Sequence, residues 1–87
     1  MILNSMDDIT SLEDKQVQLL LRELEMDELT IALKGVNPEV MEKLYKNMSP
    51  RAVEKTKERS DAMGAVPIES VEKSHANILR IAAKLDS

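Results

Sequence analysis

Two dipeptides, Asn37-Pro38 and Ser49-Pro50, restrict the fold of this chain more than any other feature of its sequence. In each, a residue whose side chain can cap a helix precedes a proline, whose missing N–H group costs nothing at the first helical position. Each cap contributes about 1 kcal/mol to helix stability. The dipeptides therefore predict two helix starts, and the first of these helices has to end before the second begins.

The composition indicates that helices also form the rest of the chain. Hydrophobic residues make up 43% of the 87 residues, but there is one Tyr and no Phe or Trp. Leu, Ile, Val and Met must therefore fill the interior, whereas sheets prefer aromatic and β-branched residues. We interpret the methionines as flexible core filler rather than as a methionine-rich docking groove. The methionines concerned are Met6, Met26, Met41, Met48 and Met63.

Apolar periodicity accounts for the other segments. Residues 1–12 predict only a short helix that frays at its start. Residues 13–24 carry apolar side chains at the i, i+3, i+4, i+7 spacing of a buried helical face. The next segment is apolar on nearly all sides, which predicts a central helix ending at Lys34, with Gly35 in the left-handed conformation after it. Residues 69–84 predict the longest helix, packed across several others.

These segments define one domain, residues 1–87, with an all-α fold. We expect a compact orthogonal bundle of about six short helices with short connections. No heptad pattern runs far enough for a coiled coil. The longest apolar run is far too short to span a bilayer, so no direct membrane insertion is expected, and the sequence reads as a soluble intracellular protein.

The helix predicted at about residues 50–63 is unusual because it carries seven charged side chains of both signs. At 100° per residue, its small and apolar side chains gather on one side, which is expected to face the core. The opposite side carries Arg51, Glu54, Lys55, Glu58 and Asp61, and Lys57 and Arg59 flank the apolar stripe. The pattern alone favours a solvated face with ion pairs such as Arg51 with Glu54 and Lys57 with Asp61. The alternative is a docking surface for a partner of complementary charge.

A family resemblance favours the docking surface. The chain resembles the C-terminal domain of the flagellar motor switch protein FliG over nearly its whole length. The resemblance is carried by the stretches "EDKQVQLLLRELEMDELTIALKG", "MEKLYKNMSPRAVEK" and "MGAV", with "ALKG" at 32–35 and "NMSPRA" at 47–52. It implies a six-helix bundle in a rotor protein of the bacterial flagellum. The charged helix would engage the cytoplasmic loop of the stator protein MotA to generate torque and set rotation direction.

The resemblance also implies roles for single residues. Lys34, Arg51 and Glu58 match charges that the family uses for stator contact, and Glu54, Lys55 and Asp61 flank them. Arg59 stands where the family has an acid, and Ala65 and Pro67 also depart from its pattern. These departures indicate a divergent member, and we expect Arg59→Asp to strengthen coupling to a family-type stator.

The same resemblance implies further partners and a location. FliM and neighbouring FliG-type subunits would bind through parts of a full-length protein, at the cytoplasmic side of the inner membrane in the flagellar basal body. The chain is interpreted as an excised domain of such a protein. The alternative is a short paralogue that acts as a helical adaptor outside torque generation.

Other functions have less support in the sequence. The lone His75 lies on an apolar stripe and there is no Cys, so we predict no enzyme and no cofactor. The acids Asp7, Asp8, Glu13 and Asp14 lack the spacing of a calcium loop, so no metal site is predicted. A small helical nucleic-acid-binding module is a further alternative, but the net charge of −4 argues against nucleic acid as a partner.

Overall fold

The computed structural model describes residues 3–85. This part of the chain forms six helices and no strand, which confirms the predicted all-α fold. The helices are η1 (Met6–Ser11), α1 (Asp14–Glu23), α2 (Met26–Leu33), α3 (Pro38–Lys46), α4 (Pro50–Met63) and α5 (Ile68–Leu85). They form a compact body of 35 × 29 × 21 Å.

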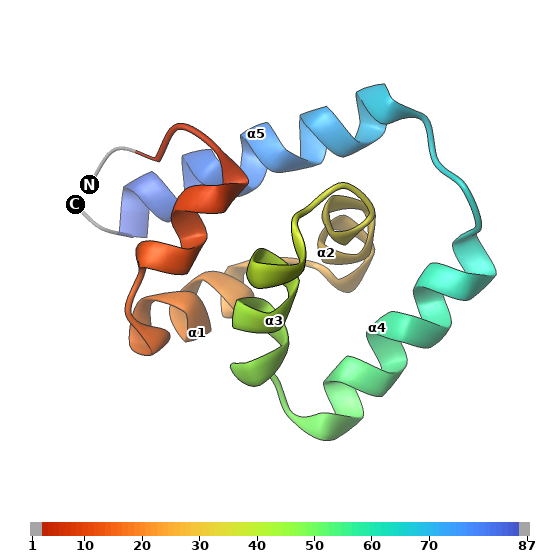
Figure 1. Ribbon diagram of the computed structural model, residues 1–87, viewed down its shortest axis with the longest axis horizontal. Helices are drawn as coiled ribbons and strands as arrows, with labels where there is room; N and C mark the ends of the chain where they lie inside the picture. The colour runs from red at the N-terminus through yellow and green to blue at the C-terminus, as the bar shows by residue number, and fades with distance from the viewer. Residues whose placement is uncertain (1–2, 86–87) are drawn as a thin grey trace.

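The long helix α5 and the short helix α2 organise the bundle (Figure 1). α5 packs against α1 and α2, as expected for the longest helix, and α2 also contacts α4. η1 packs against α3. As a result α4 forms one edge of the molecule, away from η1 and α1 (Figure 1).

The apolar core is built from every helix except α4. Its buried members are Met6, Ile9, Leu12, Val17, Leu20, Leu29, Ala32, Leu33, Val40, Leu44, Ile78 and Ala82. The only fully buried side chain of α4 is Thr56, whose hydroxyl donates to the carbonyl of Ala52 at 2.8 Å. The predicted apolar stripe of α4 therefore faces inward, but it is too thin to join the core.

The first helix differs from the prediction. The described chain before Met6 is not helical, residues 1–2 lie outside the described part, and Met6–Ser11 is a 3₁₀ helix. The burial pattern explains this, because Met6, Ile9 and Leu12 are buried and a helix with three residues per turn places all three on one face.

One of the two predicted caps forms as expected. The Ser49 hydroxyl accepts a hydrogen bond from the Ala52 N–H group at 3.1 Å, at the start of α4. Asn37 also precedes its helix, but its side-chain amide donates to Asp7 of η1 at 2.6 Å instead of capping α3. The Asn37 side chain therefore connects two helices.

The prediction for Gly35 is wrong. The only left-handed residue among those described is Gly64, with a φ of 67°, after the end of α4. Gly35 is needed for a different reason, since a Cβ atom there would lie 2.7 Å from Cγ1 of Val71. Its missing side chain allows the end of α2 to approach α5 closely.

Candidate interaction surface

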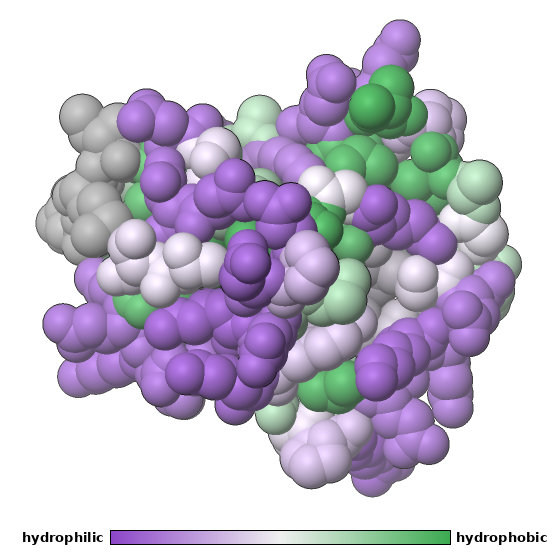
Figure 2. All heavy atoms as spheres, viewed as in Figure 1, coloured by the Kyte–Doolittle hydropathy of each residue, from purple (hydrophilic) through white to green (hydrophobic). Residues whose placement is uncertain are grey.

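The outer face of α4 is a continuous charged surface. All seven of its charged side chains are exposed: Arg51, Glu54, Lys55, Lys57, Glu58, Arg59 and Asp61. In the space-filling view the edge occupied by α4 is strongly hydrophilic (Figure 2). We call these seven residues the α4 charged face. The two ion pairs expected within it, Arg51 with Glu54 and Lys57 with Asp61, are not formed.

Arg59 is tied to the neighbouring helix α2. Its Nε donates to Oδ1 of Asp27, in the first turn of α2. This hydrogen bond lowers the pKa of the Asp27 carboxyl below its ordinary value of 3.8. Both side chains are more than half exposed, at 54% and 56%. The pair therefore contributes little to stability, but it neutralises Arg59 within the domain.

Lys57 is tied on the opposite side of α4. Its ammonium nitrogen lies 5.6 Å from the centroid of the Tyr45 ring of α3, within the range of a cation–π interaction. The two charged residues that flank the apolar stripe thus both have partners on other helices, Lys57 on α3 and Arg59 on α2.

Lys34 holds the last turns of α4. Its ammonium group donates to the backbone carbonyl of Ser60 at 2.9 Å, and the Gly64 N–H group donates to the same oxygen at 3.1 Å. A cation close to the carbonyl end of a helix is favourable because the helix dipole is negative there. Lys34 therefore connects the end of α2 to the end of α4, and its charge does not belong to the α4 charged face.

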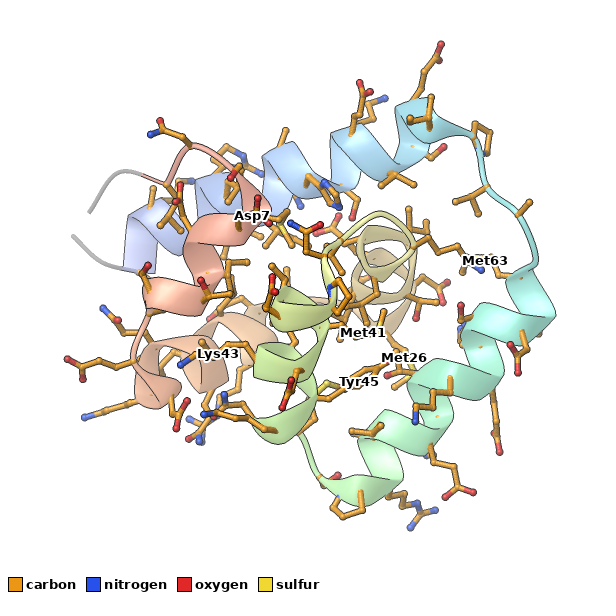
Figure 3. All side chains as sticks on the ribbon, viewed as in Figure 1. Asp7, Met26, Met41, Lys43, Tyr45 and Met63 are labelled. Carbon is orange, nitrogen blue, oxygen red and sulfur yellow. The ribbon has the colours of Figure 1, made fainter. Side chains whose placement is uncertain are left out.

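A groove lies between α2 and α4. It is open to solvent, has a volume of about 700 Å³, and is lined by Met26, Asp27, Lys55, Glu58, Arg59, Ala62 and Met63. Met26 and Met63 lie on the sides of their helices that face each other (Figure 3). The interpretation of the methionines as core filler holds for Met6, Met41 and Met48, which pack in or against the core, but not for these two.

The remaining candidate groups have structural partners. The Nε2–H group of His75 donates to the carbonyl of Ala32 at 2.8 Å and so connects α5 to α2. Asp8 accepts from backbone N–H groups, and Asp14 pairs with Lys43 at 3.1 Å. In residues 3–85 no three His, Asp or Glu side chains gather as metal ligands would. None of the helices described there is long and apolar enough to cross a membrane.

The six-helix fold and the exposed charges of α4 indicate a small all-α bundle domain with a charged interaction surface. A family model described as the FliG C-terminal domain matches residues 3–87, and the chain belongs to this family. The curated relatives that match this chain are named flagellar motor switch protein FliG.

Individual FliG proteins are similar to this chain over most of its length. FliG of Thermotoga maritima is 40% identical over 80 residues, which cover 92% of this chain and 24% of the relative. FliG of Bacillus subtilis is 38% identical over 80 residues, which also cover 92% of this chain and 24% of the relative. The structure of full-length FliG from Aquifex aeolicus matches with a TM-score of 0.89 and 30% identity, over 93% of this chain and 25% of that one. The chain thus spans about a quarter of the length of these relatives.

Proposed function

We propose that this domain is the stator-facing part of a flagellar rotor and switch protein. The α4 charged face contacts the cytoplasmic loop of the stator protein MotA, receives torque from it and sets rotation direction. FliM and neighbouring FliG-type subunits are held by other parts of the full-length protein, at the cytoplasmic side of the inner membrane in the basal body. This role requires no catalytic residue and no cofactor.

The observation that supports the proposal is the two-sided construction of α4. Its outer side presents Arg51, Glu54, Lys55, Glu58 and Asp61, which are exposed and have no ion-pair partner among the described residues. Its inner side is tied to α2 and α3 by polar contacts. Exposed charges of both signs on a fixed helix orient a charged partner and speed its encounter, while they add little to its affinity.

The residues predicted to contact the stator take different roles in this proposal. Arg51 and Glu58 contact the stator loop directly, with Glu54, Lys55 and Asp61 as flanking charges. Lys34 acts as a positioning residue, because its ammonium group is engaged by the Ser60 carbonyl. Arg59 changes specificity. The family has an acid at this position, whereas here the positive charge of Arg59 is neutralised by Asp27.

The bundle also offers a path for the transmitted force. A lateral force on α4 passes through the contacts of Lys34 and Arg59 to α2, which packs against α5. α2 and α5 both contribute to the apolar core. Because packed cores have low compressibility, the load is carried by the domain as a unit.

Charge reversal on α4 tests the proposal. In cells whose motility depends on this protein, Arg51→Glu and Glu58→Lys are expected to reduce both swimming and binding of the MotA cytoplasmic loop. Lys73→Glu and Glu72→Lys are the matched controls, since they make the same charge changes at exposed positions of α5. Wild-type motility and stator binding in both α4 variants would show that this face is not the stator surface.

The role of Arg59 needs a separate comparison. Arg59→Asp places two carboxylates face to face, because Asp27 remains in α2. We therefore expect the stronger stator coupling predicted for Arg59→Asp to emerge fully only in the double variant Arg59→Asp with Asp27→Asn. Weaker coupling in both variants than in the parent would mean that Arg59 itself has a matched acid on the stator.

A further inference from the structure

One wall of the groove between α2 and α4 is a single stripe of α4. From α4 it is lined by Lys55, Glu58, Arg59 and Ala62, which follow one another at the i, i+3, i+4, i+7 spacing of a single helical stripe. From α2 it is lined by Met26 and Asp27 in the first turn. The groove therefore runs along α4 beside the α4 charged face, and its other side is formed by α2.

The inner part of the groove is apolar. Met26 and Met63 are half-buried, and the small side chain of Ala62 lines the same groove. Methionine is flexible and polarizable, so it adapts to an inserted apolar side chain. When a partner covers this surface, apolar area is removed from water, which lowers the free energy of binding. The surrounding charged side chains do not contribute this hydrophobic term.

The charges at the rim restrict what can enter. Asp27 and Arg59 neutralise each other, whereas Lys55 and Glu58 have no ion-pair partner in the described part of the chain. Because Lys55 and Glu58 are three residues apart on one face of α4, a complementary helix needs a carboxylate and a cation about one turn apart. This rim does not fit nucleic acid, since Glu58 and Asp27 would repel phosphates.

We propose that this groove anchors the stator loop by an apolar side chain. The occupant is a helical segment of the MotA cytoplasmic loop, with one large apolar residue inserted between Met26 and Met63. A carboxylate of the same segment faces Lys55, and a cation faces Glu58. This inference rests on the proposed function and adds to it a contact that is independent of charge.

The two kinds of contact have separable kinetic effects. Rim charges mainly affect the association rate and its salt dependence, whereas a desolvated apolar anchor mainly affects the dissociation rate. The stator must stay engaged while force acts and must then release. An adaptable methionine-lined groove sets this lifetime without changing the charge pattern that guides encounter.

The test is the binding of the purified MotA cytoplasmic loop to the full-length protein, measured as separate association and dissociation rates. The variant Met26→Gln with Met63→Gln keeps the formal charge and is expected to dissociate about tenfold faster, with an unchanged salt dependence. Ala62→Gln obstructs the groove from an exposed position, so it tests the same contact with little risk to folding. The matched control is Ile68→Gln, an exposed apolar residue outside the groove.

The outcomes separate this inference from the proposed function. If Arg51→Glu weakens binding while both groove variants dissociate like the parent, the apolar anchor is refuted and the stator-facing role stands. If groove and charge variants both weaken binding and Ile68→Gln does not, both stand. Parent-like rates in all of these variants would overturn both.

Discussion

Gly35 and Arg59 are the residues whose surroundings differ most from what their sequence context indicates. Gly35 follows a helix, as a left-handed glycine often does, yet its role is to let α2 approach Val71 of α5. Arg59 lies on a charged helix face, yet it pairs with Asp27 of α2. In both cases the decisive partner is far away in the sequence, so no local pattern could identify it.

The close approach at Gly35 predicts a cost for any side chain there. Gly35→Ala is expected to lower the free energy of unfolding by about 1 to 3 kcal/mol, because the new methyl group overlaps Cγ1 of Val71. Chemical denaturation measures the change. In a Val71→Ala background, which removes that atom, the same glycine substitution should cost less. An equal cost in both backgrounds would exclude this contact as the cause.

The Asp27–Arg59 pair predicts a pH effect on stability. Because the hydrogen bond from Arg59 lowers the pKa of Asp27 in the folded state, the pair stabilises the domain above about pH 4 and is lost as the pH falls through the folded pKa. In an NMR titration, Arg59→Gln should raise the pKa of Asp27 toward its ordinary value of 3.8.

Asp14 provides the internal control for that titration. Hydrogen bonds from Asn47 and Lys43 lower the pKa of the Asp14 carboxyl independently of α4. Its pKa should therefore stay the same in Arg59→Gln. A depressed pKa of Asp27 in the Arg59→Gln variant would contradict the assignment of Arg59 as its main partner.

At the scale of elements, α4 differs from the other helices because it adds no residue to the buried apolar core. Thr56 is the buried side chain of α4, and Lys34, Lys57 and Arg59 make the polar contacts between this helix and its neighbours. η1 is the opposite case, since three buried apolar residues hold a helix of six residues. The charged face of α4 remains exposed because only the opposite side of this helix packs against the bundle.

The different environments of the two caps predict different effects of removing them. Ser49→Ala should lower the free energy of unfolding by about 1 kcal/mol and speed amide hydrogen exchange in the first turn of α4, because the Ala52 N–H group loses its acceptor. Asn37→Ala should instead speed exchange in η1, because the contact with Asp7 is lost. Faster exchange at the start of α3 in Asn37→Ala would mean that Asn37 acts as a cap after all.

At the scale of the whole molecule, stability depends on the packing of α5 over α1 and α2. The buried side chains Ile78 and Ala82 join the core of this packing, and hydrogen bonds from Ser74 and His75 to α2 carbonyls align the two helices. α4 packs mainly against α2 and adds no residue to the core. The domain is therefore expected to unfold as one unit, with local opening easiest at α4.

Two isoleucines of α5 provide a matched test of this view. Ile78 is 1% exposed and Ile68 is 72% exposed, on the same helix. Ile78→Ala should lower the free energy of unfolding by about 2 to 5 kcal/mol, because it opens a cavity in the core, whereas Ile68→Ala should change it by less than about 0.5 kcal/mol. Thermal unfolding followed by circular dichroism measures both. Similar effects of the two substitutions would contradict the assigned core.

Periodicity and caps were sufficient to predict most of the fold. The starts of α3 and α4, the inward face of α4 and the length of α5 follow from residues that lie within a few turns of one another. The 3₁₀ geometry of η1, the role of Asn37 and the groove lined by Met26 and Met63 did not follow, because each depends on contacts between separate helices. The charges of the candidate site were predicted, but their pairing was not.

The sequence by itself determined the α-helices of this protein and the family to which it belongs, because local hydrogen bonding, apolar spacing and residue identity are carried by the chain directly. Only the tertiary structure decided which charges on and beside α4 are available to a partner. Lys34, Lys57 and Arg59 are engaged by groups on other helices, and Arg51, Lys55 and Glu58 are not. The physical reason is that the electrostatic environment of a side chain depends on distances in space, which packing sets and sequence order does not reveal.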